Sequence, residues 1–339
     1  MDSLKKIIGI IFAVLFISTA VPALIFFNFE RRTFTTETYQ KAFANADFYN
    51  KLPVVMADAM LSGSTDQSKL PVVMRGMNQE AWEAFFRTML PPETLKVMGD
   101  DMLNASFAYL NMRTNSVQLS LVPLKTSMVS DTGVQAVFTL LNTQPDCTLE
   151  QMAQMAFDLL TKSEIQFCKP PAELYPMLTP AIQGQMQFAT LAVPDQITLI
   201  SAPPENDPRV KLQTMRILMR LSPMLSLGLL LLMTIFTVSS LKSWLVWWGI
   251  PLSITGATAS LMSLIGAPIF GAILQSILVN RMPAFLPAIL LDYTSDLTSA
   301  MLQALLSPVL WQGLIIAFIG LVMATGSYFI KGKSTSTTA

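Results

Sequence analysis

The sequence predicts an α-helical integral membrane protein with four transmembrane helices and a mainly helical extracytoplasmic domain inserted between the first and the second. Apolar residues make up 52% of the 339-residue chain and charged residues only 13%, a balance outside the range of ordinary soluble domains. Long uncharged stretches lie toward both ends of the chain, and most of the charged residues lie between them. Together these observations favour several membrane crossings around one solvated domain.

The first uncharged stretch, residues 7–29, is long enough to cross a hydrocarbon layer of about 30 Å as a helix. A cleaved signal peptide is the alternative, because Val21 and Ala23 fit a small-residue cleavage site behind two lysines. The apolar run continues beyond that site through Phe27, longer than a typical signal core. Residues 1–29 are therefore predicted to stay attached as a signal-anchor helix.

Residues 30–220 have the composition of a solvated domain, with charged residues spread throughout and turn residues between short amphipathic stretches. Apolar residues at helical spacing predict helices that begin near Asn78, Pro92 and Asp131. Two runs of alternating polarity, residues 117–122 and 196–201, predict a small β-ribbon. This segment is predicted to be a mainly α domain with stalk-like ends.

Residues 221–330 form the predicted three-helix membrane domain, and their charged residues are Lys242, Arg281, Asp292 and Asp296. The charges delimit three crossings, at residues 221–238, 244–273 and 308–330. Between the last two crossings, residues 282–306 are amphipathic and are predicted to lie at the membrane surface as an interfacial helix. Residues 331–339 would form a short cytoplasmic tail.

The positive-inside rule orients these segments. With four crossings both termini lie on one side, and the short segments on that side carry Lys5, Lys6, Lys242, Lys331 and Lys333. Lysine-rich short segments face the cytoplasm, whereas long domains cross largely regardless of charge. We therefore expect a multi-pass protein of the cell (cytoplasmic) membrane with both termini in the cytoplasm and residues 30–220 outside it.

That orientation decides how to interpret the cysteines, of which the chain has only Cys147 and Cys168. Outside the cytoplasm two cysteines most often oxidise to a disulfide bond, and a catalytic redox pair usually has the C-x-x-C spacing, which is absent. Thr148 and Gln151 resemble a capping box that starts a helix, after which the chain can return to the first cysteine. Closing a loop of ~20 residues stabilises a fold by about 3 kcal/mol.

Several residues fit structural roles at or within the membrane. Arg209, Arg216 and Arg220 lie on one face of a helical stretch before the second crossing and are predicted to anchor lipid head groups, with a partner surface as the alternative. Further interface anchors are predicted at Lys242, Trp244, Trp247 and Trp248. Small residues that allow close helix packing within the bundle or between subunits are Gly249, Ser253, Gly256 and Ser260.

Signals for chemistry are weak. The chain has no histidine, which removes the commonest general base and zinc ligand, so we expect no cofactor, no metal and no enzymatic activity. The tripeptide Asp131-Thr132-Gly133 occurs in aspartic proteases, but a second copy is missing and an aspartate at a helix start is ordinary. The 22 methionines, some at helical spacing, are more typical of adaptable core packing than of a cuprous copper site.

The first functional hypothesis is a non-enzymatic membrane protein whose outer domain binds a partner or ligand or acts as a scaffold. Its partners would be the lipid bilayer and a protein partner or a second copy of the chain, and its charge pattern gives no sign of nucleic-acid binding. The alternative is a permease-like subunit of a transport or mechanotransmission complex with a separate ATPase. The layout is similar, in topology alone, to that of lipoprotein-releasing and macrolide-exporter permeases. A membrane hydrolase using carboxylates or serine is the third hypothesis.

Overall fold

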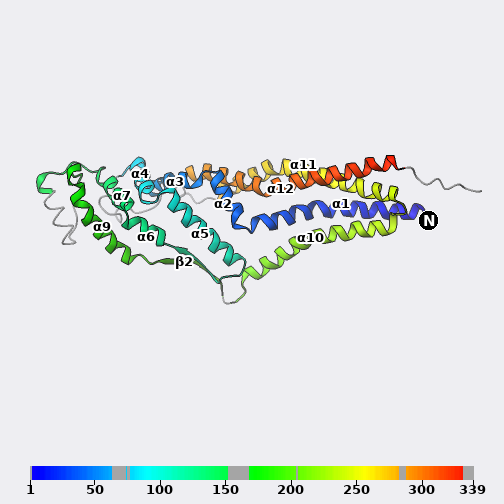
Figure 1. The fold of residues 1–339 in the computed structure, drawn as a ribbon, viewed down its shortest axis with the longest axis horizontal. Coiled ribbons are helices and arrows are strands. Elements are labelled where there is room, and N and C mark those ends of the chain that lie inside the picture. The colour runs from blue at the N-terminus through cyan, green and yellow to red at the C-terminus, as the bar shows by residue number, and fades with distance from the viewer. Residues whose placement is uncertain are drawn as a thin grey trace, which may run out of the picture. The chain divides into compact units, whose positions relative to one another are not determined.

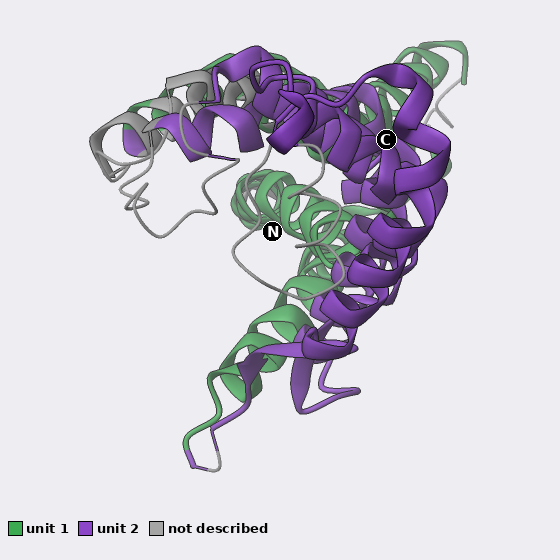
Figure 2. Ribbon diagram, turned by 90° about the vertical axis from the view of Figure 1, so that its left-hand side faces the viewer, with its two compact units in different colours: residues 1–38, 206–276, 298–339 green, residues 39–205, 277–297 purple. Residues whose placement is uncertain are grey.

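The computed structural model describes residues 2–62, 74, 77–151, 168–203, 205–281 and 288–330 and is mostly helical. The chain divides into two compact units (Figure 2). Unit 1 comprises residues 1–38, 206–276 and 298–339, and unit 2 comprises residues 39–205 and 277–297.

Within the described residues, four helices are long and apolar enough to cross a membrane, as the sequence predicts, which is consistent with a multi-pass membrane protein. They are α1 (Asp2–Thr33), α10 (Pro208–Thr237), α11 (Leu241–Arg281) and α12 (Ala288–Phe329) (Figure 1). The spans within them are Lys5–Thr33, Pro208–Thr237, Leu241–Ile273 and Thr298–Phe329. Apolar length and few charges were sufficient signals for all four.

The boundaries of the last helix differ from the prediction. The sequence places an interfacial helix at residues 282–306 and a new crossing from Pro308, whereas α12 continues unbroken through Pro308 and its candidate span begins at Thr298. A proline within a long membrane helix is tolerated, because neighbouring groups can satisfy the freed carbonyl. An amphipathic pattern therefore did not mark a helix end here. Residues 282–287 lie outside the described part of the chain.

In unit 1, α1 and α10 lie side by side (Figure 1). Phe16 of α1 is buried against Leu230 and Met233 of α10, and Trp247 and Trp248 of α11 pack on the same cluster. α10 starts at Pro208, so the helical stretch before the predicted second crossing is continuous with that crossing. This continuity puts the arginines of that stretch on the same rigid helix as the span.

Unit 2 is mainly helical in its described part. Besides the end of α11 and the start of α12, it contains α2 (Thr36–Asn45, shared with unit 1), α3 (Phe48–Ser62), α4 (Gln79–Met89), α5 (Pro92–Leu110), α6 (Val122–Val129), α7 (Asp131–Leu141), the short 3₁₀ helix η3 (Ala172–Leu174) and α9 (Tyr175–Ala192). Trp82 and Phe85 of α4 are buried with Leu140 of α7, and Met60 and Met89 pack against them. These methionines therefore fill gaps in a core.

The predicted β-ribbon is confirmed. β1 (Ser116–Ser120) pairs antiparallel with β2 (Gln196–Ser201), and Val117 lies opposite Ile200. Val117 is 2% exposed, while all of β2 is exposed. The ribbon therefore packs into the unit through β1.

The Cys147–Cys168 disulfide bond is also confirmed, with the two Cα atoms 5.0 Å apart. The backbone N–H of Cys147 donates to the carbonyl of Lys169 at 3.0 Å, so a short bridge lies beside the bond. The capping box forms as well: Gln151 N–H donates to Thr148 Oγ1, and the Thr148 N–H donates to Gln151 Oε1. The helix expected after it falls outside the described residues.

The Asp131-Thr132-Gly133 tripeptide occupies the first turn of α7. Gly133 is buried where α6 turns into α7, and a Cβ atom there would meet the carbonyl oxygen of Met128. The glycine therefore allows two helices to meet closely. The tripeptide has a structural explanation in this fold that needs no second aspartate.

Candidate functional site

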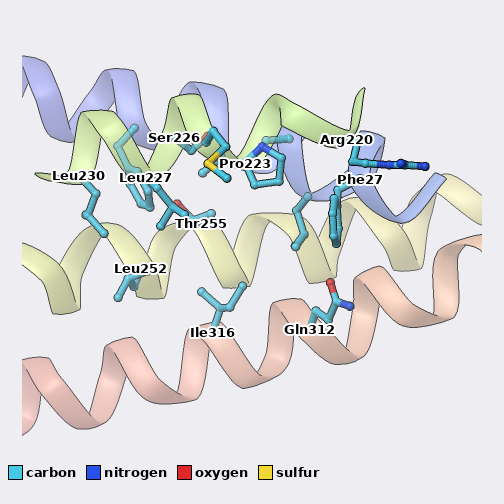
Figure 3. A pocket seen from close by; sticks show the side chains of 15 residues that line it. Phe27, Arg220, Pro223, Ser226, Leu227, Leu230, Leu252, Thr255, Gln312 and Ile316 are labelled. Atoms are coloured by element: carbon cyan, nitrogen blue, oxygen red, sulfur yellow. The ribbon is translucent and has the colours of Figure 1, made fainter. Parts of the chain in front are cut away.

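The candidate membrane helices of unit 1 line an apolar groove of 390 Å³. Side chains of all four spans line it, among them Phe16, Leu24, Leu227, Leu252 and Ile316. Figure 3 shows Phe27 and Arg220 at one end of the groove, with Leu230 and Leu252 at the other. The groove is thus apolar along most of its length and charged at one end. An apolar cavity with few convergent polar groups is the usual form of a small-molecule site.

Two polar side chains from the α11–α12 side interrupt this apolar lining. Gln312 of α12 accepts a hydrogen bond from Asn28 Nδ2 at 2.7 Å, and the same Asn28 amide donates to the carbonyl of Leu24 at 2.8 Å. Thr255 of α11 is 3% exposed, and its Oγ1 has no hydrogen-bond partner. A buried hydroxyl without a partner costs about 1–3 kcal/mol in an apolar setting.

The charged end of the groove is an ion cluster formed by Glu30, Arg216 and Arg220. Glu30, near the end of α1, is only 2% exposed. Its Oε1 accepts from a terminal guanidinium nitrogen of Arg216 at 3.1 Å and of Arg220 at 2.7 Å. The two arginines can reach one carboxylate because they lie four residues apart on one face of α10.

A second cavity of 330 Å³ adjoins this cluster. Phe27 and Arg220 line both cavities, so the two cavities are neighbours at these side chains. Arg31 also lines the second cavity, as does Phe34, whose ring centroid lies 4.3 Å from the Arg216 guanidinium carbon. Stacking on an aromatic face and pairing with a carboxylate together stabilise a largely buried guanidinium.

This arrangement differs from the role that the sequence suggested for the arginines. Arg216 is 8% exposed and paired with Glu30, so it is not a free head-group anchor, whereas the Arg220 side chain is 60% exposed. Sequence reasoning missed Glu30 because it is the first charge after the apolar stretch and was assigned to the solvated domain. The sequence does contain a signal for this cluster. It is a lone carboxylate at the end of the first predicted crossing, together with two arginines at i, i+4 spacing just before the second.

A third arginine on the predicted face, Arg209, has a separate partner. Its guanidinium lies 2.7 Å from the carboxylate of Asp207, which caps the start of α10. Hydrogen bonds from the Arg209 side chain and backbone N–H lower the pKa of Asp207 below its usual range. The pair keeps the start of α10 capped and charged.

Two of the three tryptophans predicted as interface anchors, Trp247 and Trp248, pack against other candidate spans. Trp248 Nε1 donates to Thr234 Oγ1 of α10 at 2.7 Å, and the Trp244 ring centroid lies 5.3 Å from that of Trp248. Trp247 packs with the buried cluster of α1 and α10, and Lys242 is exposed at the start of α11. Their place relative to a bilayer stays a prediction.

The small residues of α11 lie against a matching series on α12. A Cβ atom on Gly249 would lie 2.6 Å from the backbone nitrogen of Ala324, and one on Gly256 would meet the backbone of Gly313 and Ala317. Ser253 and Ser260 face Gly320 and Gly313 in the same way. The sequence prediction named only the α11 half, although Gly313 and Gly320 repeat the seven-residue spacing of Gly249 and Gly256.

No protein-family model, curated protein or solved structure matches this chain. Among the described residues there is also no group of three or more His, Cys, Asp or Glu side chains placed to hold a metal ion. Unit 1 defines, by its own geometry, a bundle of candidate membrane helices that contains an apolar groove with a cationic end.

We expect Gly256→Ala to destabilise unit 1 by about 1–3 kcal/mol, because the new methyl group would push against α12 backbone that cannot rotate away. Gly228→Ala on α10 is the matched control. A Cβ there meets nothing within 4 Å, and alanine is the better helix former by up to about 1 kcal/mol. Thermal unfolding in detergent micelles measures both, and equal shifts for the two variants would contradict the close packing.

Proposed function

We propose that this chain is a non-enzymatic multi-pass protein of the cell membrane whose membrane helices bind a lipid-like amphiphile. The observation that carries the proposal is the groove of 390 Å³ in unit 1, apolar along its length and charged at the end lined by Arg220. An amphiphile has the same division into a long apolar part and a polar end. Its tail would lie among Leu24, Leu227 and Leu252, with its polar end toward Arg220.

The apolar length of the groove favours an acyl chain over a compact polar solute. A cavity lined by aliphatic and aromatic side chains offers few hydrogen-bond partners, so a polar solute would lose its hydration without replacement. Gln312 near the Arg220 end and Thr255 further along supply limited hydrogen-bonding capacity, which can orient a chain that carries an ester or hydroxyl group (Figure 3). The bilayer itself is an abundant source of such molecules.

The proposed topology keeps both termini in the cytoplasm and residues 30–220 outside it. Two features support it: the lysines of the short segments, and the disulfide bond, which persists mainly in oxidising compartments. On this topology unit 2 is presented outside the membrane, as a scaffold or as a binding domain for a protein partner or a second copy of the chain. Residues 1–29 would serve as an uncleaved anchor.

Cysteine labelling in intact cells tests the topology. We expect a membrane-impermeant maleimide to label Glu173→Cys in η3 without permeabilisation and to label Ser240→Cys, in the turn between α10 and α11, only after permeabilisation. Both positions are exposed, and the native cysteines are joined to each other and do not compete. The reverse pattern would place unit 2 in the cytoplasm and contradict the proposal.

Groove occupancy is tested with Leu227→Trp, which adds bulk to a side chain that lines the groove. We expect several-fold less co-purifying lipid per protein than in the wild type, measured by native mass spectrometry from mild detergent. Leu231→Trp is the matched control, because Leu231 lies one turn further along α10 with similar exposure, 57% against 54%, and is not among the lining residues.

Equal lipid retention by the two tryptophan variants would overturn the groove as a binding site. A wild-type protein that retains no lipid in mild detergent would overturn the proposed function altogether. Stoichiometric co-purification of an ATPase would instead favour the permease-like role that the sequence layout suggests.

A further inference from the structure

The second cavity of unit 1 has a marked excess of positive charge. Among the described residues, three guanidinium groups line it, those of Arg31, Arg216 and Arg220, and Glu30 is the single carboxylate. This described lining therefore carries two more positive charges than negative ones. Because Phe27 and Arg220 line both this cavity and the apolar groove, an occupant of the groove with its polar end toward Arg220 would bring that end next to this excess.

We propose that this cavity binds the phosphomonoester head group of an amphiphile whose tail lies in the groove, so that the ligand belongs to the phosphatidate class. The inference rests on the proposed function and specifies its ligand. Guanidinium groups match phosphate oxygens with paired N–H donors, and they keep their charge at any physiological pH. The head group would be held between Arg31 and Arg220, with Arg216 behind them.

The size of the charge excess selects the phosphomonoester. A phosphate monoester carries about −1.5 to −2 at neutral pH, which would balance the two excess positive charges of the lining. A phosphodiester or a carboxylate carries a single charge, and a zwitterionic head group carries none overall. Each of these would leave part of the excess positive charge of the cavity unbalanced.

Glu30 orients the cluster for this task. Its carboxylate accepts from both Arg216 and Arg220, and Arg216 is also fixed over the ring of Phe34. Each guanidinium has five N–H donors, and one carboxylate that is shared by two arginines cannot accept hydrogen bonds from all of them. The Arg220 side chain remains 60% exposed, so it is accessible to a head group while Glu30 holds its position. Glu30 is thus a positioning residue and limits the positive charge of the free cavity.

The experiment measures binding of chain-matched phosphatidate, phosphatidylglycerol and phosphatidylcholine to the delipidated full-length protein in detergent micelles, with inorganic phosphate as a further probe. We expect the protein to bind phosphatidate most tightly, phosphatidylglycerol less tightly and phosphatidylcholine least tightly. Each surface arginine near an anionic lipid contributes about fivefold in affinity. Arg220→Gln and Arg31→Gln should therefore each weaken phosphatidate binding about fivefold and leave phosphatidylcholine binding unchanged.

Two variants separate a head-group site from a purely structural cluster. Arg32→Gln is the matched control, because Arg32 is an exposed cation beside Arg31 that does not line the cavity, and its removal should leave the lipid preference unchanged. Glu30→Gln should act in the opposite direction to Arg220→Gln and strengthen phosphatidate binding relative to phosphatidylcholine. If the cluster were merely structural, Glu30→Gln and Arg220→Gln would both weaken the binding of all three lipids.

Equal affinity for the three lipids, or phosphatidate binding unaffected by both Arg220→Gln and Arg31→Gln, would overturn this inference and leave the proposed function standing. Loss of binding of all three lipids by the wild type would overturn both. Inorganic phosphate that binds as tightly as phosphatidate would show a simple anion site and contradict the lipid assignment.

Discussion

The pairing of Glu30 with Arg216 and Arg220 is the constraint on which the membrane unit depends. Glu30 is almost fully buried near the end of α1, and an isolated carboxylate in that setting would carry a desolvation cost of several kcal/mol. Its partners come from one face of α10, so α1 and α10 must lie alongside each other with these residues at the same level. Apolar packing of Phe16 against Leu230 and Met233 is compatible with that alignment but is less directional.

The groove follows from two different modes of helix packing. Small residues on α11 and α12 bring those two backbones into direct contact, while Pro223, Met224 and Leu227 on α10 face them across the groove. Phe16 and Phe27 line this space on the α1 side. The groove therefore lies between the α1–α10 pair and the α11–α12 pair, and Arg220 of the ion cluster lines one end of it.

The sequence predicts those features of the fold that depend on a single local property of the chain. Apolar length identifies the four candidate spans, alternating polarity identifies the ribbon, and the presence of only two cysteines, without C-x-x-C spacing, favours the bond between Cys147 and Cys168. The candidate site was only partly accessible, because it depends on contacts across some 190 residues of chain between Glu30 and Arg220. From the sequence alone Arg220 has the position of a surface anchor, and Glu30 has the position of the first residue of a solvated domain. The α12 boundary was missed because neither Pro308 nor an amphipathic pattern ends a helix that is held by its neighbours.

A double-mutant cycle between Glu30 and Arg216 tests the central interaction most directly. Unfolding free energies in detergent micelles would be compared for the wild type, Glu30→Gln, Arg216→Gln and the double variant. Glu30→Gln takes the Glu30 carboxylate away from the buried Arg216 guanidinium, and Arg216→Gln leaves buried Glu30 with Arg220 alone, so each single variant weakens the pairing of a buried charge. The double variant should therefore lose less than the sum of the single losses, by about 1.5 kcal/mol or more. Losses that add to within about 0.5 kcal/mol would mean that the two residues do not interact, and the account of the membrane unit would be wrong.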